Sequence, residues 1–209
     1  MKIGVLALQG AFREHIRMLK SLGVEAIEIR LPCELNQVDG LIIPGGESTT
    51  MRKLLAEYGL IDAIKKFAAA GDPIFGTCAG LIVMADRVNG HKQDLLNLID
   101  IDVERNAYGR QVESRETDIP SPFLGQDPFP AVFIRAPQIL STGPGVEPLA
   151  LYQDRVVLAR QKNILVATFH PELTGDTRIH KVFLQMLGRK AQDLNDSRDK
   201  ESAPHQETR

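Results

Sequence analysis

The feature that most constrains this chain is a pentapeptide, Gly76-Thr77-Cys78-Ala79-Gly80, which lies between two short apolar runs. The run before it is Pro73-Ile74-Phe75, and the run after it is Leu81-Ile82-Val83-Met84-Ala85. This order predicts a buried strand, a sharp turn and a buried helix. The glycines permit backbone angles that a side chain would block, and they leave room for a substrate beside the backbone. We therefore expect Cys78 at the tip of a nucleophile elbow.

In such a turn, Cys78 would lie at the N-terminus of the following helix. The helix dipole and the free N–H groups there favour the thiolate, which is the reactive form of cysteine. The N–H of Ala79 would point to the place where an oxyanion forms. A buried cysteine can also be no more than a small apolar side chain in a tight α/β turn. The pentapeptide by itself leaves both interpretations open.

The first half of the chain alternates apolar strand patterns with helical patterns. We expect strands at residues 3–8, 24–29 and 40–43, and helices at 11–22 and 49–70, with a break near Tyr58-Gly59. This alternation predicts a parallel, doubly wound sheet with helices on both faces, whose site lies at the carboxyl ends of the strands. Gln9-Gly10, the Gly45-Gly46-Glu47-Ser48 loop and Cys78 each follow a predicted strand. Three loops should therefore meet at one edge of the sheet.

The second half of the chain has a different pattern of apolar residues. Residues 98–170 contain short apolar runs broken by Pro and Gly, which predicts largely antiparallel strands added to the parallel core. Asp176 is a suitable N-cap for a last helix that ends near Gly188. We therefore expect one α/β domain over residues 1–190, with three layers and a mostly parallel central sheet of flavodoxin-like type. Residues 191–209 are polar and are predicted to form a disordered tail.

Composition excludes several classes of protein. A net charge of −2 gives no reason to expect nucleic acid or an anionic membrane as a partner. Cys33 and Cys78 lie far apart and form no CxxC pattern, so neither a disulfide framework nor a zinc site is expected. A reducing cytoplasm is the natural compartment for such a chain. No apolar stretch approaches the length of a transmembrane helix.

A nucleophilic cysteine needs a base, and the base needs an orienting group. The candidates are His170 and Glu172, which follow the apolar run 164–169 and are separated by a rigid proline. In an extended backbone, residues two apart point the same way, so the carboxylate would fix the imidazole tautomer. His-x-Glu alone is a weak signal, and it gains weight beside the elbow. The other histidines are less convincing: His15 and His180 lie within helices, and His91 lies in a polar loop.

Three further segments carry groups that suit substrate binding. The Pro44–Thr50 loop lacks the Gly-Lys-Ser/Thr ending of a phosphate loop, so its glycine N–H groups are better suited to a carbonyl oxygen, with Ser48 or Thr49 capping the next helix. Arg105 and Arg135 lie near predicted turns, where arginine grips carboxylates through paired hydrogen bonds. Structural pairing of either arginine is the alternative, and it is the preferred one for Arg110.

Five motifs in order resemble one known family. They are Leu8-Gln9-Gly10-Ala11-Phe12, Pro44-Gly45-Gly46-Glu47-Ser48-Thr49-Thr50, Arg105-Asn106-Ala107-Tyr108-Gly109-Arg110-Gln111, Phe133-Ile134-Arg135-Ala136-Pro137 and Phe169-His170-Pro171-Glu172-Leu173. Together with the elbow, they resemble the glutaminase subunits of pyridoxal 5′-phosphate synthases, a branch of the class I (triad) glutamine amidotransferases. The resemblance covers about residues 1–190. No motif position departs from the pattern.

The resemblance implies a function for each motif. Cys78 would attack the amide of L-glutamine, His170 would shuttle protons, and Glu172 would orient His170. Glutamine would be held by Gly46, Glu47, Ser48, Arg105, Ile134 and Arg135, and the oxyanion by the N–H groups of Gly46 and Ala79. The released ammonia would pass to a separate barrel-shaped synthase subunit within a large hetero-oligomer. No cofactor or metal is expected on this chain.

Three alternatives stay open on the sequence. The chain could serve another pathway as an amidotransferase subunit, such as histidine biosynthesis, because the triad motifs alone do not separate pathways. It could be a partner-binding relative without catalysis, although the intact Cys78, His170 and Glu172 argue against this. A cysteine peptidase of similar fold is the third alternative.

Overall fold

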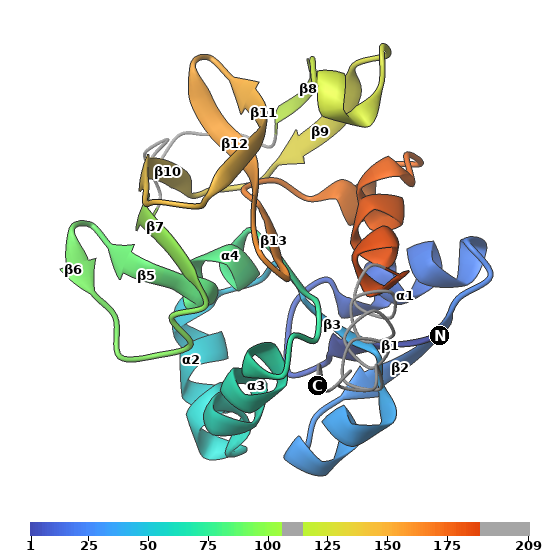
Figure 1. The fold of residues 1–209 in the computed structure, drawn as a ribbon, viewed down its shortest axis with the longest axis vertical. Helices are drawn as coiled ribbons and strands as arrows, with labels where there is room; N and C mark the ends of the chain where they lie inside the picture. The colour runs from blue at the N-terminus through green and yellow to red at the C-terminus, as the bar shows by residue number, and fades with distance from the viewer. Residues whose placement is uncertain (106–114, 189–209) are drawn as a thin grey trace, which may run out of the picture.

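The computed structural model describes residues 1–105 and 115–188, and its core is a seven-stranded sheet (Figure 1). The strand order is β11-β12-β13-β4-β3-β1-β2. The five strands from β13 to β2 pair in parallel, and β12 and β11 extend one edge in antiparallel fashion. The bounds are β1 Lys2–Leu6, β2 Glu25–Ile29, β3 Gly40–Ile43, β4 Ile74–Thr77, β11 Glu147–Tyr152, β12 Arg155–Gln161 and β13 Ile164–Ala167.

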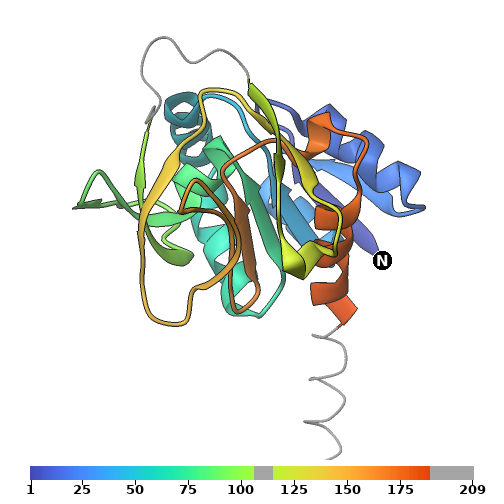
Figure 2. The same cartoon turned by 90° about the horizontal axis from the view of Figure 1, so that it is seen from above.

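Helices cover both faces of this sheet, as the sequence predicts. In β3, Leu41 and Ile43 belong to one apolar cluster and Ile42 to the other, because neighbouring side chains of a strand point to opposite faces. Figure 2 shows α1 and the last helix, at residues 178–188, on one side of the sheet and α2 and α3 on the other. The helices are α1 Phe12–Ser21, α2 Ser48–Glu57, α3 Leu60–Ala69 and α4 Ala79–Met84.

The prediction for residues 98–170 is correct in part. A four-stranded sheet has the order β10-β7-β5-β6, and β8 pairs antiparallel with β9. However, β5 runs parallel to β7, and β13 pairs parallel to β4 in the central sheet. The run 164–169 therefore belongs to the core, and its fully buried apolar side chains are typical of a central parallel strand. The remaining strands are β5 Ala85–Val88, β6 His91–Lys92, β7 Ile99–Glu104, β8 Arg115–Ile119, β9 Phe129–Phe133 and β10 Gln138–Thr142.

The last helix is attached to the proline-rich segment 120–130 by one arginine. The helix begins at Arg178, so Thr177 and not Asp176 occupies the cap position, but the Asp176 carboxylate still accepts the N–H of Arg178 at 2.9 Å. The Arg178 guanidinium then donates to the carbonyl oxygens of Asp127 at 2.6 Å and Pro128 at 2.8 Å. Within 120–130, Pro122–Leu124 form the short 3-10 helix η2. A second 3-10 helix, η1, covers Pro32–Gln37.

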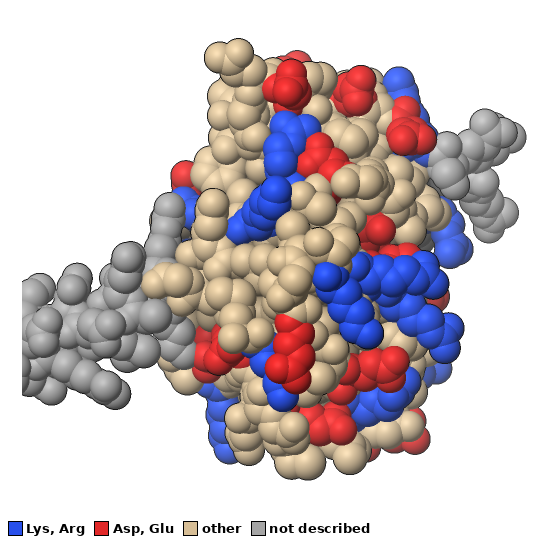
Figure 3. All heavy atoms as spheres, turned by 90° about the vertical axis from the view of Figure 1, so that its right-hand side faces the viewer, with Lys and Arg blue, Asp and Glu red and all other residues tan. Residues whose placement is uncertain are grey.

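Two predictions concern the extent of the domain. The single domain over residues 1–190 and the disordered tail at 191–209 remain predictions, since the tail lies outside the described residues. Among the helices of residues 1–105 and 115–188, none combines the length and the apolar character needed to cross a membrane. On the face shown in Figure 3, acidic and basic side chains are both present rather than separated by sign.

The turn after β4 packs tightly against β3. A Cβ atom placed on Gly80 would overlap the carbonyl group of Ile43, which is backbone and has no freedom to move aside. Gly80 thus lets α4 approach β3 closely enough to set the start of the helix at the edge of the sheet.

We predict that Gly80→Ala destabilises the fold, because the added methyl group enters occupied backbone space. The expected loss in the free energy of unfolding is at least about 2 kcal/mol. Urea unfolding followed by far-ultraviolet circular dichroism measures it, since the chain has no tryptophan. Gly175→Ala is the matched control, because a Cβ there meets no atom. Equal stability of the two variants would contradict the close approach of α4 and β3.

Candidate active site

Cys78 lies on a sharp elbow between β4 and α4. Its φ of 47° and ψ of −104° are unusual for a residue with a side chain. The neighbouring backbone holds this strained conformation, because the N–H of Cys78 donates to the carbonyl of Ala167 at 2.9 Å and its own carbonyl accepts the N–H of Ile82 at 3.2 Å. The elbow places the thiol at the N-terminus of α4, as the sequence predicts.

The register between β4 and β13 brings His170 to the same edge of the sheet. Thr77 pairs with Ala167, so the residues that follow the two strands emerge together. His170 is 6% exposed, and its Nδ1 lies 2.8 Å from Oε1 of the buried Glu172. The predicted contact is present, but the extended backbone expected for it is not: Pro171–Leu173 form the 3-10 helix η3. The proline at the first position starts this turn and folds the carboxylate back toward the imidazole.

The ionisation of His170 and Glu172 is set by competing effects. Burial alone would lower the pKa of His170, but the neighbouring Cys78 and the hydrogen-bonded Glu172 outweigh burial and raise the pKa to about 10. Burial alone would raise the pKa of Glu172, but His15 and His170 beside it lower the pKa below its ordinary value. His170 is therefore the cationic member of the arrangement at neutral pH, and Glu172 is a carboxylate.

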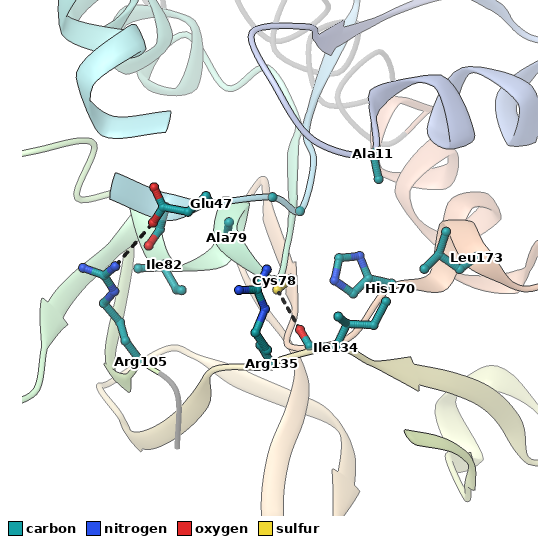
Figure 4. Close-up of a pocket in the computed structure, with 13 residues that line it drawn as sticks. Ala11, Glu47, Cys78, Ala79, Ile82, Arg105, Ile134, Arg135, His170 and Leu173 are labelled. Carbon is teal, nitrogen blue, oxygen red and sulfur yellow. Dashed lines mark hydrogen bonds and ion pairs between the residues drawn. The ribbon is translucent and has the colours of Figure 1, made fainter. Parts of the chain in front are cut away.

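A cavity of about 330 Å³ opens in front of Cys78 (Figure 4). Its size is within the usual range for a small-molecule site. All of the site residues predicted from the sequence except Glu172 line it, and Glu172 lies buried behind His170. The predicted residues that line the cavity are Gly46, Glu47, Ser48, Cys78, Ala79, Arg105, Ile134, Arg135 and His170.

The side of the cavity near α2 carries paired charges. Glu47 caps α2, since its carboxylate accepts the N–H groups of Thr49 at 2.9 Å and Thr50 at 2.7 Å. This corrects the prediction that Ser48 or Thr49 caps the helix: Ser48 is already its first residue. Hydrogen bonds from Thr50 and Thr49 lower the pKa of Glu47 to about 2. Arg105 donates to the Thr49 hydroxyl at 2.9 Å and lies 3.7 Å from the Glu47 carboxylate.

The opposite side of the cavity is formed by the turn after β9. The Cys78 sulfur lies 3.9 Å from the carbonyl oxygen of Ile134, and Figure 4 shows this contact beside Arg135. Arg135 has a φ of 45°, a rare conformation for arginine, so the turn is held by its surroundings. Gly45 lies against the His170 ring so closely that a Cβ there would overlap the ring. A glycine at position 45 is thus required for His170 to reach the cavity.

Sequence reasoning missed several residues around this site. His15 and His180, set aside as helix residues, are fully buried and lie behind Glu172 together with Thr77. One signal was available: His15 lies one turn before the core residue Leu19, and a histidine on an apolar helix face needs a polar partner. Leu173 was quoted only as part of a motif, but it lines the cavity and is 43% exposed.

Some of the predicted features fall outside the described part of the chain. Residues 106–114 are not described, so the Asn106–Gln111 part of the arginine motif and Arg110 within it cannot be placed. Within residues 1–105 and 115–188, no group of three or more His, Cys, Asp or Glu side chains is arranged to hold a metal ion.

The comparisons with known proteins show which family the chain belongs to. The family model of the SNO glutamine amidotransferase family matches residues 5–189. The chain belongs to this family. The matched range includes the elbow, the His-x-Glu segment and every residue predicted to line the cavity.

Individual relatives cover nearly the whole chain. The pyridoxal 5′-phosphate synthase subunit PdxT of Pelotomaculum thermopropionicum is 54% identical over 192 residues, which are 92% of this chain and 98% of that protein. A crystal structure of a glutamine amidotransferase is 49% identical, covers 89% of this chain and 98% of its own, and superposes with a TM-score of 0.83. The structure of PurLQS from Thermotoga maritima, at 17% identity and a TM-score of 0.64, covers 89% of this chain and 98% of its own and shares the fold.

We predict that Cys78 reacts with iodoacetamide in a way that depends on His170. Because a raised pKa keeps His170 protonated below about 10, a cation shares the cavity with the Cys78 sulfur throughout the neutral range and favours the reactive thiolate. In His170→Ala this cation is lost, and alkylation of Cys78 at neutral pH should be several-fold slower. Mass spectrometry of both cysteine peptides measures this, and the exposed Cys33 is the internal control, with the same rate in both proteins. An equal rate at Cys78 in wild type and variant would contradict the pairing.

Proposed function

We propose that this chain hydrolyses L-glutamine to L-glutamate and ammonia through a Cys78-His170-Glu172 triad. The Cys78 sulfur attacks the side-chain amide carbon of glutamine, which forms a C–S bond and places negative charge on the oxygen. The N–H groups of Gly46 and Ala79 stabilise that charge. The C–N bond then breaks, His170 gives a proton to the leaving nitrogen, and ammonia departs from a thioester.

Water completes the cycle. His170, now neutral, takes a proton from a water molecule, whose oxygen attacks the thioester carbon. The C–S bond breaks, glutamate leaves, and the His170/Cys78 pair is restored. Glu172 stays ionised and holds His170 in the tautomer that presents Nε2 to the reacting atoms, a role that its contact at Nδ1 supports.

Charge complementarity supports glutamine as the substrate. The amino acid carries an ammonium and a carboxylate group, and the cavity offers Glu47 for the first and Arg105 and Arg135 for the second. Ser48 and the backbone around Ile134 add polar contacts within the same cavity. The volume of about 330 Å³ suits a small amino acid better than a folded peptide segment, which argues against a peptidase.

One observation carries the proposal: a cysteine on a positive-φ elbow shares a cavity with a histidine whose far nitrogen lies 2.8 Å from a buried carboxylate. Relatives at 54% and 52% identity are named pyridoxal 5′-phosphate synthase subunit PdxT, which supports the same pathway for this chain. We infer that the ammonia passes to a synthase subunit in a large hetero-oligomer. In this proposal the chain supplies ammonia for the synthesis of pyridoxal 5′-phosphate (vitamin B6) in the cytoplasm. Neither nucleic acid nor a membrane is a partner.

We predict that Cys78→Ala separates the two nitrogen sources of the assembled complex. Formation of pyridoxal phosphate from glutamine should be abolished, because the thioester cannot form. Formation from added ammonium salts should stay near the wild-type rate, because Cys78 only releases ammonia. The product chromophore is followed with either nitrogen source, and Cys33→Ala is the control, since that cysteine lies on the exposed surface.

Two outcomes would contradict this part of the proposal. Retention of the glutamine-driven reaction in Cys78→Ala would mean that another residue is the nucleophile. Loss of both reactions in a complex that still assembles would mean that Cys78 does more than release ammonia.

A second prediction concerns the synthase subunit itself. The carbonyl of Gly45 accepts the N–H of Ala11 at 3.1 Å, and this hydrogen bond fixes the peptide that carries the Gly46 N–H. Because two glycines flank that peptide, a docked partner can turn it at low energetic cost and align the oxyanion donor. We expect the isolated chain to hydrolyse glutamine slowly and its synthase to accelerate it roughly 10-fold or more. Glutamate release with and without the synthase measures this, and equal turnover would overturn it.

A further inference from the structure

A row of buried polar side chains continues the triad away from the cavity. His15 of α1, Thr77 of β4 and His180 of the 178–188 helix have no exposed surface, and Glu172 is 5% exposed. His15 Nε2 lies 3.4 Å from Glu172 Oε2 and 3.3 Å from the Thr77 hydroxyl, and its Nδ1 lies 3.0 Å from His180 Nε2. Three separate elements thus bring their polar side chains together behind Glu172.

The two oxygens of Glu172 have different surroundings. Oε1 faces His170 Nδ1 at 2.8 Å, whereas Oε2 has no hydrogen-bond partner among the described residues. The group that faces Oε2 is His15 Nε2, at a distance slightly beyond that of an ordinary hydrogen bond. The contact is therefore mainly electrostatic, and because both side chains are buried it is stronger than it would be at the surface.

The hydrogen bond between the two histidines selects one pair of tautomers. One of the facing nitrogens, His15 Nδ1 and His180 Nε2, must carry the proton. If it were His15 Nδ1, His180 would carry its proton on Nδ1, and the lone pair of His15 Nε2 would face the Glu172 carboxylate. If it is His180 Nε2, His15 accepts that proton and carries its own on Nε2, between the Thr77 hydroxyl at 3.3 Å and Glu172 Oε2 at 3.4 Å. His180 Nδ1, which has no partner in the described residues, is then a bare acceptor rather than an unpaired donor.

Neither of these two imidazoles is charged at neutral pH. Burial lowers the pKa of His180 to about 3, and the neighbouring His15 contributes to this shift. Burial also lowers the pKa of His15, and Glu172 and Glu14 only partly oppose this, while His170 adds to it. The pair behind Glu172 therefore acts through N–H dipoles of fixed direction and not through positive charge.

We propose that His15 is a positioning residue of the reaction: its Nε2–H holds the Glu172 carboxylate so that Oε1 meets His170, and His180 fixes the tautomer of His15. The inference rests on the proposed function, because it assigns a role within that triad. His15 is not among the residues that line the cavity. Its effect on the reaction passes through Glu172.

Loss of His15 has a specific consequence for pH dependence. Without the Nε2–H, the buried Glu172 carboxylate loses the largest of the interactions that lower its pKa and keeps His170 and a backbone N–H, so it takes up a proton more readily. A protonated Glu172 no longer accepts the Nδ1–H of His170 and no longer fixes its tautomer. Activity should then be lost on acidification at a higher pH than in the wild type. A residue that only supports packing has no such effect.

The test uses the assembled complex with the synthase and three variants. His15→Phe keeps a ring and removes the N–H; we expect kcat for glutamine to fall about 10- to 100-fold with little change in KM, and the acid limb of kcat/KM to move to higher pH. His15→Gln keeps a side-chain N–H of similar reach. Its kcat and the pH of its acid limb should therefore lie much closer to the wild-type values than those of His15→Phe. Phe75→Leu is the packing control, because Phe75 contacts the rings of His15 and His180 at centroid distances of 6.2 and 5.9 Å. Phe75→Leu should lower the melting temperature and leave the pH of the acid limb of kcat/KM unchanged.

A measurement on the wild-type protein is independent of how the variants fold. Nitrogen-15 NMR of the histidine rings reports their tautomers, and His15→Gln assigns the His15 signal. We expect both His15 and His180 to be neutral with the proton on Nε2. A proton on Nδ1 of His15, or a His15→Phe variant that is folded and keeps the wild-type kcat and pH profile, would overturn the inference. Failure of the wild-type complex to hydrolyse glutamine would instead overturn the proposed function, whatever the tautomers are.

Discussion

The site depends on the parallel pairing of β4 with β13. These strands lie 90 residues apart in sequence order, and their register places Thr77 opposite Ala167. Cys78 and His170 follow those two residues, so a shift of one position in either strand would turn one of the two side chains away from the other. The backbone hydrogen bond from Cys78 to Ala167 extends the pairing into the elbow and holds the strained φ of the cysteine. The pairing that forms the centre of the sheet therefore also sets the positions of Cys78 and His170.

Much of this arrangement could be predicted from the sequence. Local signals were sufficient to predict the elbow, because glycines at positions 76 and 80 between two apolar runs are compatible with few other local structures. The parallel sheet followed from the alternation of strands and helices, and the meeting of three loops followed from the parallel sheet. The contact between His170 and Glu172 was also predicted, but on the wrong backbone: a proline that starts a 3-10 turn was taken as a spacer in an extended segment.

The rest depends on long-range contacts that a sequence pattern does not contain. Nothing local distinguishes the run 164–167 as a central strand from the antiparallel runs around it. The cap of α2 was assigned to Ser48 or Thr49 because hydroxyls usually cap, whereas the Glu47 carboxylate reaches two N–H groups. His15 and His180 are 165 residues apart, and although the apolar helix face around His15 indicates that this histidine needs a polar partner, the sequence does not identify the partner. The fold brings the two side chains together behind Glu172.

The central claim is that Cys78 is the nucleophile toward glutamine. The most direct measurement is covalent labelling of the complex with diazo-oxo-norleucine, a glutamine analogue that alkylates the nucleophile of glutamine-hydrolysing enzymes. Peptide mass spectrometry then locates the label, and the glutaminase activity of the same sample is recorded. We expect one label per chain on Cys78, none on Cys33, protection by glutamine, and loss of hydrolysis in proportion to labelling. A label on another residue, or continued hydrolysis by fully labelled protein, would contradict it.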